Sequence, residues 1–266
     1  MSVRLNGVLI GNECYPNNER IFKTVGLKFV DSNYTDVITM NYETDVDIFK
    51  VAMCKKYLDD LGKPAILNIF YMPYSRMDRE IDGYIFSLKY CCWLINSLNF
   101  YMVQILDPHS DVVTELLNRY NILTPKQYIL TAIKNENPDY ILCPDAGAYK
   151  RYKALYLYKE VPMFYAAKKR DLQTGQIISY DLVDAPDLTD KTVLIVDDLC
   201  SKGRTFLEAG KLLKNAGAKK VALYVTHCEN SIYKGELLRT DYVDHIYTTN
   251  SILPRSEHKK ITVFNI

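Results

Sequence analysis

Two adjacent aspartates end an apolar run late in the chain, where VLIV at residues 193–196 leads into DDLCSKGRT. A loop that enters a helix offers unpaired backbone N–H groups at the positive end of the helix dipole, and phosphate is the usual occupant of such a site. Ser201 and Thr205 add hydroxyl groups, and Gly203 allows close backbone approach. Asp197 and Asp198 suit sugar hydroxyls or Mg²⁺. The pattern predicts a sugar-phosphate pocket; the alternative is a solvated strand end with a serine-rich turn.

Three other predicted strands also end in polar or charged loops. AILNIF at residues 65–70 leads into YMPYSRMDR, YMVQIL at residues 101–106 into DPHSD, and YILC at residues 140–143 into PDAGAYKR. In α/β folds with parallel strands, ligands bind beyond the carboxyl ends of the strands. The four loops therefore predict one shared cleft.

Strands and helices alternate along the chain, which predicts an α/β fold with largely parallel sheets. Helices are expected at residues 47–61, ending at Gly62, at residues 83–100, mostly buried, and at residues 206–215 before Gly217, with a further strand at residues 220–225. The segment NENPD within residues 128–139 marks a boundary, which gives two domains, residues 1–133 and 134–266.

Composition excludes several classes of protein. Hydrophobic residues make up 48% of the 266 and charged residues 24%, which predicts a sizeable core. The 33 basic and 32 acidic residues leave a net charge of +1, so no basic surface for nucleic acid is expected. The sequence contains neither G-x-x-x-x-G-K-[ST] nor G-x-G-x-x-G after a strand, so it predicts neither an ordinary P-loop NTPase nor an ordinary dinucleotide enzyme.

The sequence also predicts a cytoplasmic protein without membrane contact. No apolar run approaches the roughly 20 residues that span a bilayer, and the amino terminus is too polar for a signal peptide. The seven cysteines are scattered without a CxxC pair, which is typical of reduced thiols, mostly in the core, and gives no zinc-ligand spacing.

The loop DDLCSKGRT resembles the ribose-phosphate binding signature of the type I phosphoribosyltransferase fold. The other loops resemble segments of the ribose-phosphate pyrophosphokinase (PRPP synthetase) family: YMPYSRMDR its FPYARQDR, DPHSD its DLHA, CPDAGAYKR its SPDAGGAKR, and AKKRD its Lys-x-Arg catalytic loop. VTHC and TTNSILP are similar to its LTHG and TNTIP. These segments follow the family's order from Lys28 to about Pro254. The resemblance implies two similar phosphoribosyltransferase-like halves, each a mostly parallel sheet flanked by helices.

That family transfers the β,γ-diphosphoryl group of ATP to the 1-hydroxyl of ribose 5-phosphate with Mg²⁺, and forms PRPP and AMP. The resemblance implies an amino-terminal half for ATP, adenine and oligomer contacts, and a carboxyl-terminal half with the ribose 5-phosphate loop and a catalytic flap. The implied catalytic residues are Lys168 and Arg170, and the implied metal contacts are His109 and Asp145. The remaining implied contacts are Phe29, Asp31, Asn33, Arg76, Asp78 and His109 for ATP; Asp145, Ala146 and Gly147 for the diphosphate side; and Asp197, Asp198, Cys200, Ser201, Lys202, Gly203, Arg204 and Thr205 for ribose 5-phosphate.

The family segment that matches Phe29 and Asn33 reaches adenine across a subunit interface, so the resemblance implies a homo-oligomer, a dimer or a dimer-based assembly. Two other functions stay open. One is a phosphoribosyltransferase that uses PRPP and a nucleobase, which would not need the RMD and Lys168/Arg170 loops together. The other is a catalytically silent regulatory subunit, against which the full set of matched residues argues.

The chain departs from the family's pattern at several positions. Met77 and Asn33 replace the usual Gln and Glu, which leaves the nucleotide preference open. Arg204 stands where the family prefers a small residue, and it either adds a phosphate contact or crowds the pocket. The sequence stops soon after the last matched strand, where cellular relatives continue with another helix, so weakened allosteric regulation is expected.

Overall fold

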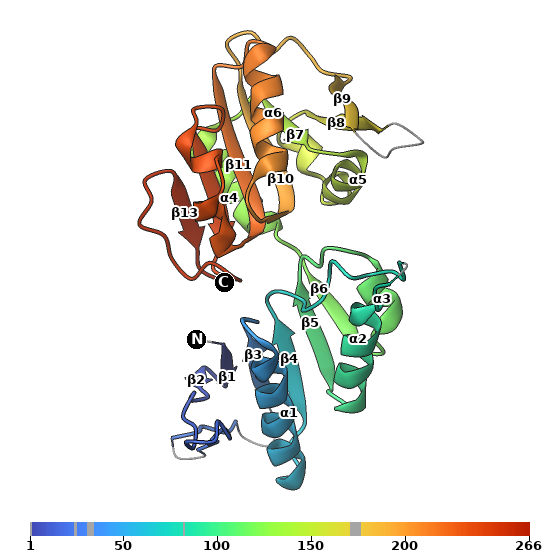
Figure 1. Ribbon diagram of the computed structural model, residues 1–266, viewed down its shortest axis with the longest axis vertical. Coiled ribbons are helices and arrows are strands. Elements are labelled where there is room, and N and C mark those ends of the chain that lie inside the picture. Colours follow the sequence, from blue (N-terminus) through green and yellow to red (C-terminus); the bar gives the residue numbers. More distant parts are fainter. Residues whose placement is uncertain (1, 24–25, 31–34, 82, 171–176) are drawn as a thin grey trace. The chain divides into compact units, whose positions relative to one another are not determined.

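The chain forms two compact units, Met1–Thr124 and Pro125–Ile266, in the computed structural model (Figure 1). The structure describes residues 2–23, 26–30, 35–81, 83–170 and 177–266, without the side chains of residues 158, 168–170 and 177–179. The expected boundary at residues 133 and 134 falls inside helix α4 (Lys126–Glu136), whose Ile129 and Ala132 pack in a core of the second unit.

The first unit is a six-stranded sheet in the order β2-β1-β3-β4-β5-β6, in which β3 to β6 run parallel and β1 and β2 are antiparallel. Its elements are β1 (Val3–Leu5), β2 (Val8–Leu9), β3 (Asp36–Met40), α1 (Asp45–Asp60), β4 (Ala65–Ile69), α2 (Ser87–Ser97), β5 (Met102–Leu106), α3 (Val112–Leu116) and β6 (Tyr120–Leu123). Alternate residues of β4 are buried, as expected for a strand with one face against helices. Thr44 and Asp47 form a capping box that begins α1.

Helix α2 is shorter and more exposed than the sequence predicted. It covers Ser87–Ser97 rather than residues 83–100, and it buries Leu88, Cys91, Cys92 and Ile95 along one stripe. The opposite face leaves Tyr90 57% and Trp93 67% exposed. The expectation of a mostly buried helix was wrong because apolar residues occupy both faces and the sheet covers only one.

The second unit is a seven-stranded sheet in the order β13-β12-β11-β10-β7-β8-β9, parallel except for the β8–β9 pair. Its remaining elements are β7 (Tyr140–Cys143), α5 (Ala146–Ala154), η1 (Leu157–Lys159), β8 (Met163–Arg170), β9 (Ile177–Val183), β10 (Thr192–Cys200), α6 (Arg204–Asn215), β11 (Lys220–Cys228), η2 (Asn230–Lys234), η3 (Leu237–Arg239), β12 (His245–Thr249) and β13 (Ile261–Phe264). Two mostly parallel sheets flanked by helices confirm the predicted fold class.

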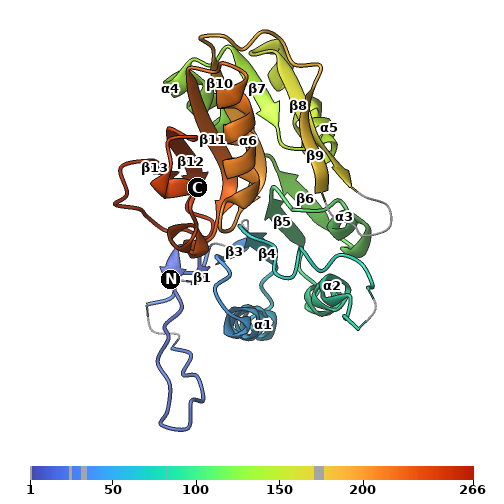
Figure 2. The ribbon, with the colours of Figure 1, turned by 45° about the horizontal axis from the view of Figure 1, so that its top comes forward.

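Strand β10 is buried on both faces, which explains its continuous apolar run. Val193 and Ile195 pack in the core beneath α6, whereas Leu194 and Val196 pack in the core beneath α4 and α5 (Figure 2). The strand does not stop at Val196 as predicted. It continues through Asp197 and Asp198 to Cys200, because it stays paired with β11 as far as the Cys200–Cys228 register pair.

No described helix is long and apolar enough to cross a membrane. Cys14 is exposed, the other six cysteines are buried, and all seven are free thiols, which matches the predicted core role for most of them.

Gly210 tests the packing of α6 on the second unit. A Cβ atom at this position would lie 2.6 Å from the backbone oxygen of Tyr242, and backbone cannot move aside cheaply. We expect Gly210→Ala to lower the free energy of unfolding by about 1–3 kcal/mol in a denaturant titration. Gly11→Ala is the control, because nothing lies within 4 Å of that position. Equal stability of the two variants would contradict the packing described.

Candidate active site

Three carboxylates lie at the carboxyl ends of two neighbouring strands in the second unit. Asp145 follows β7 and caps α5, where its Oδ1 accepts a hydrogen bond from the Ala148 amide at 2.8 Å. Asp197 and Asp198 lie in β10, which pairs directly with β7. Glycine at position 147 leaves room for the Asp145 side chain, because a Cβ atom there would lie 3.2 Å from Asp145 Oδ1. The strand pairing thus brings together the sites predicted for diphosphate and for ribose.

The carboxylates of this cluster lie close enough to affect one another's charge. Asp198 is nearly buried and pairs with Arg151 of α5, whose Nη1 lies 3.4 Å from Asp198 Oδ2. Burial, with the charges of Asp198 and Asp145, holds the pKa of Asp197 well above its usual range. Arg151 was not among the residues predicted from the sequence, although it lies in the helix that begins at the neighbouring acidic loop. The acidic cluster suits a ligand that brings hydroxyl donors or a cation.

A helix start with a glycine cap follows the two aspartates. Gly203 precedes α6 with φ +80°, and a Cβ there would lie 2.7 Å from Leu237 Cδ2, so both backbone and space favour glycine. The first amide bonded within α6 is that of Leu207, which donates to the Gly203 carbonyl at 2.9 Å. The amides before it point out of the helix start, as an anion site requires.

The side chains of the loop differ in what they offer a ligand. The Ser201 hydroxyl donates to Glu229 Oε2 at 2.7 Å, so its proton already has an acceptor. Cys200 is fully buried, which leaves only its backbone for a ligand. Thr205 is half-buried in the first turn of α6.

Arg204 is the first residue of α6. It is exposed and lines a pocket of about 450 Å³ with Lys202 and Lys234, beside the acids Glu208 and Glu236. This pocket lies between the start of α6 and the turn before η3. The replacement of a small residue by arginine therefore adds positive charge along the outer side of the loop.

In the first unit, the expected ATP residues follow two neighbouring strands. Arg76 and Asp78 lie in the loop after β4, and His109 lies in the loop after β5, which pairs with β4. Arg76 is exposed, whereas Asp78 and His109 are half-buried. Two hydrogen bonds shape the first loop. The Met77 amide donates to the Tyr74 carbonyl at 2.8 Å within a turn, and the Leu88 amide at the start of α2 donates to the Met77 carbonyl at 3.2 Å.

Phe29 lies at the opposite end of the same sheet. Its ring is 6.1 Å from that of Tyr57, near the end of α1, and Lys63 Nζ lies 5.8 Å from its centre, just before β4 begins. Strand β4 separates it from Arg76 and Asp78, which follow the other end. One copy of the unit therefore does not bring Phe29 together with the rest of the expected ATP site. Asp31 and Asn33 lie outside the described residues.

Lys168 and Arg170 are in strand β8, which pairs with β9 through the register pairs Lys168–Tyr180 and Arg170–Ile177. Their side chains, like residues 171–176 of the expected flap, lie outside what the structure describes. Tyr180, opposite Lys168, donates to the Pro144 carbonyl at 3.0 Å. Burial, with the charges of Asp145 and Asp197, raises the pKa of Tyr180. Strand β9 therefore lies beside the carboxylate cluster.

Metal contacts were expected at His109 and Asp145. Within the described residues, no group of three or more His, Cys, Asp and Glu side chains is arranged to hold a metal ion. The two residues belong to different units.

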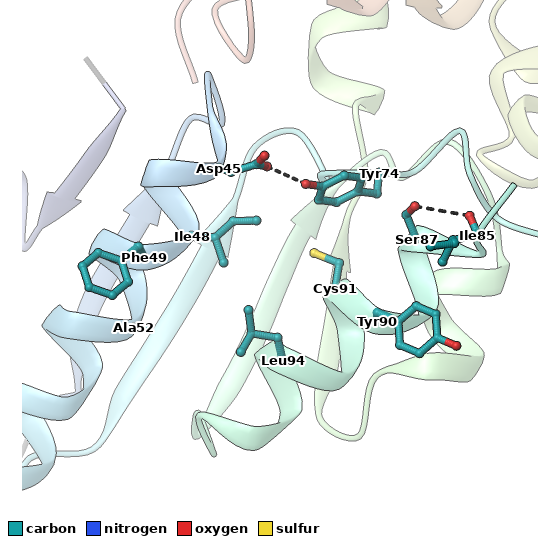
Figure 3. A pocket seen from close by; sticks show the side chains of 10 residues that line it. All are labelled: Asp45, Ile48, Phe49, Ala52, Tyr74, Ile85, Ser87, Tyr90, Cys91 and Leu94. Atoms are coloured by element: carbon teal, nitrogen blue, oxygen red, sulfur yellow. Dashed lines mark hydrogen bonds between the residues drawn. The ribbon is translucent and has the colours of Figure 1, made fainter. Parts of the chain in front are cut away.

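A second pocket, of about 590 Å³, lies between α1 and α2 and contains none of the expected site residues (Figure 3). Its walls are apolar, with Ile48 and Phe49 on one side and Leu94 on the other. At one end the Tyr74 and Tyr42 hydroxyls both donate to Asp45 Oδ1, at 2.5 and 2.7 Å. These hydrogen bonds hold the pKa of Asp45 below its usual range.

The raised pKa of Asp197 has a measurable effect on stability. Ionising this carboxyl costs folding free energy above the raised pKa, and the cost vanishes below the ordinary value of 3.8. We expect Asp197→Asn to raise the thermal midpoint at neutral pH, with a gain that fades as the pH falls toward 3.8. The measurement is thermal unfolding across this pH range.

Asp139→Asn provides the control of opposite sign. The Thr192 amide and Lys191 hold the pKa of Asp139 below its usual range, so its ionised form stabilises the fold. Loss of stability in both variants at neutral pH would contradict the charge balance described here.

Residues 124–251 match the family model of the phosphoribosyl transferase domain. The fold is similar to the crystal structure of phosphoribosylpyrophosphate synthetase from Mycobacterium smegmatis, with a TM-score of 0.67 and 19% identity over 82% of this chain and 73% of that chain.

Two curated archaeal relatives are both named ribose-phosphate pyrophosphokinase. The protein from Saccharolobus solfataricus is 29% identical over 252 residues, which cover 92% of this chain and 85% of the relative. The protein from Sulfurisphaera tokodaii is 30% identical over 227 residues, which cover 84% of this chain and 77% of the relative. This extent of similarity, together with the shared fold, shows that the chain belongs to the ribose-phosphate pyrophosphokinase family.

Proposed function

We propose that the chain is a Mg²⁺-dependent ribose-phosphate diphosphokinase, which transfers the β,γ-diphosphoryl group of ATP to the 1-hydroxyl of ribose 5-phosphate. The observation that carries this proposal is the pair of carboxylates in β10 directly before a glycine-capped helix start. It occurs in a chain whose relatives are named ribose-phosphate pyrophosphokinase.

The second unit holds ribose 5-phosphate. Asp197 and Asp198 accept hydrogen bonds from the ribose hydroxyls, and Arg151 pairs with Asp198 and orients it. The amides at the start of α6, with the Thr205 hydroxyl, hold the 5-phosphate. Lys202 and Arg204 add positive charge at the rim of this loop.

Separate groups hold ATP. Arg76, Asp78 and His109, in adjoining loops of the first unit, bind the nucleotide, and Asp145, Ala146 and Gly147 at the start of α5 take the diphosphate side. The 1-oxygen of ribose attacks the β-phosphorus, the bond from that phosphorus to the α,β-bridging oxygen breaks, and AMP leaves with the oxygen. The hydroxyl proton passes to water. Lys168 and Arg170 stabilise the charge on the transferring group.

The carboxylate cluster fits Mg²⁺. Mg²⁺ keeps several waters and is usually held by one or two carboxylates plus substrate phosphates. Burial contributes most to the raised pKa of Asp197, the charges of Asp198 and Asp145 raise it further, and a cation would oppose this second effect. In the second unit Asp145 would hold the ion, directly or through water, and His109 is the metal contact that the family resemblance implies in the first unit. When bound, the ion neutralises polyphosphate charge during transfer.

The position of Phe29 supports a homo-oligomer. This ring lies at the far end of β4 from Arg76 and Asp78, so a second copy is needed for it to reach the nucleotide. The assembly is a dimer or is built from dimers. A cytoplasmic location is supported by the seven free thiols.

The reaction itself provides the first test. Incubation with ATP, ribose 5-phosphate and Mg²⁺ should release AMP and PRPP, and a chelator should abolish both. If a purified, folded chain gives no AMP beside an active control enzyme, the proposal is wrong. PRPP consumption with a nucleobase would favour the phosphoribosyltransferase instead.

Lys168→Ala and Arg170→Ala test the roles of those residues. Each should lower kcat by about 100-fold or more, with little change in the KM for ribose 5-phosphate, because their charge acts on the transferring group. Lys211→Ala is the control, since this lysine of α6 contacts Glu208 and the Tyr242 ring and is not an expected site residue. Equal losses in turnover and in ribose 5-phosphate binding would mean that these residues act in binding.

A further inference from the structure

The segment that follows β11 lies directly against the ribose 5-phosphate loop. We call Glu229–Leu237 the clamp segment; it contains η2 and the first residue of η3. Three residues of the clamp segment contact three consecutive residues of the loop. Glu229 contacts Ser201, Gly235 contacts Lys202, and Leu237 contacts Gly203.

Glu229 makes the polar part of this contact. Its amide donates to the Cys200 carbonyl at 2.8 Å, which extends the pairing of β10 with β11 by one further bond. Its Oε2 accepts from the Ser201 hydroxyl at 2.7 Å and from the Ser231 hydroxyl at 2.9 Å. The two serine oxygens are 3.0 Å apart. A half-buried carboxylate therefore holds the hydroxyl at the start of the loop through charge-assisted hydrogen bonds.

Gly235 and Leu237 make the close-packed part. A Cβ on Gly235 would lie 2.0 Å from the Lys202 carbonyl oxygen, so backbone packs against backbone. Leu237, 1% exposed, fills the space beside Gly203 that any larger residue would need. The loop is therefore held on one side along its whole length before any ligand arrives.

We propose that Glu229 is a positioning residue for ribose 5-phosphate, which acts through Ser201 to preform the phosphate loop. This proposal rests on the proposed function. Because the Ser201 proton goes to Glu229, this hydroxyl does not donate to phosphate. The 5-phosphate is held by the amides at the start of α6 and by Thr205, and Glu229 sets the direction of those amides. Preforming a loop improves affinity because less conformational freedom is lost on binding.

An alternative role for Glu229 is a direct effect of its charge on the bound phosphate. If the Glu229 charge acted on the phosphate itself, repulsion would weaken binding, and removal of the charge would lower the KM for ribose 5-phosphate. If Glu229 acts by positioning Ser201, its removal raises that KM.

A double-mutant cycle separates these cases. Glu229→Ala and Ser201→Ala should each raise the KM for ribose 5-phosphate about tenfold, which corresponds to about 1.4 kcal/mol. The KM for ATP, and kcat at saturating substrates, should stay within about twofold. The KM of the double variant for ribose 5-phosphate should be no higher than that of the single variant with the larger increase, because both changes remove the same interaction.

Three further variants distinguish a change in ribose 5-phosphate binding from a loss of folding. Ser231→Ala removes one donor without touching the loop, and it should raise the KM less than Glu229→Ala does. Glu229→Gln keeps one acceptor oxygen and should partly rescue the alanine variant. Glu257→Gln, an exposed acid of the same unit outside the clamp segment, should change nothing. Titration calorimetry with ribose 5-phosphate alone should reproduce each shift in affinity.

Additive effects in the cycle, equal shifts in both KM values, or a lower KM for ribose 5-phosphate in Glu229→Ala would overturn the role assigned to Glu229. These outcomes leave the wild-type activity intact. Failure of the proposed function would instead appear in the wild-type chain, as no AMP release and no calorimetric binding of ribose 5-phosphate.

Discussion

The continued pairing of β10 with β11 is the interaction on which the proposed site depends. It carries Asp197 and Asp198 past the end of the apolar run and holds them at the buried end of the sheet, where ionised carboxylates are costly. Arg151 pairs with Asp198, while burial and the neighbouring carboxylates keep the pKa of Asp197 raised. The proposed site for sugar hydroxyls and a cation therefore costs folding free energy, and the cores on both faces of the strand supply the stability that offsets this cost.

The phosphate loop depends on a second constraint, the close approach of the segment after β11. Ser201, Lys202 and Gly203 each have a partner there, one by hydrogen bond and two by close packing. Without these contacts, a loop of small residues would adopt many conformations and would lose conformational entropy when a ligand binds. The same topology explains both features, because β10 and β11 are neighbours and their loops leave the same edge of the sheet.

The features that depend on residues close together in the sequence were predicted. The apolar run at residues 193–196, the capped helix start after it, and the loops that follow β4, β5 and β7 lie where the pattern placed them. The extension of β10 through two aspartates was not predictable, because only the partner strand makes it favourable. Arg151 and Glu229 were not predicted because each meets a partner distant in the sequence: Arg151 reaches Asp198 from α5, and Glu229 reaches Ser201 across the β10–β11 pair. The exposed face of α2 was missed because periodicity does not say which of two apolar faces the sheet will cover.

In the proposed reaction, a diphosphoryl group moves as one piece to ribose 5-phosphate. This transfer is followed with ATP labelled at the β-phosphorus, in the presence of ribose 5-phosphate and Mg²⁺, by separation of the products. We expect the label to appear in PRPP and the AMP formed to carry none. Label recovered in ADP, with unlabelled phosphate on the sugar, would mean transfer of a single phosphoryl group and would show that the proposed reaction is wrong.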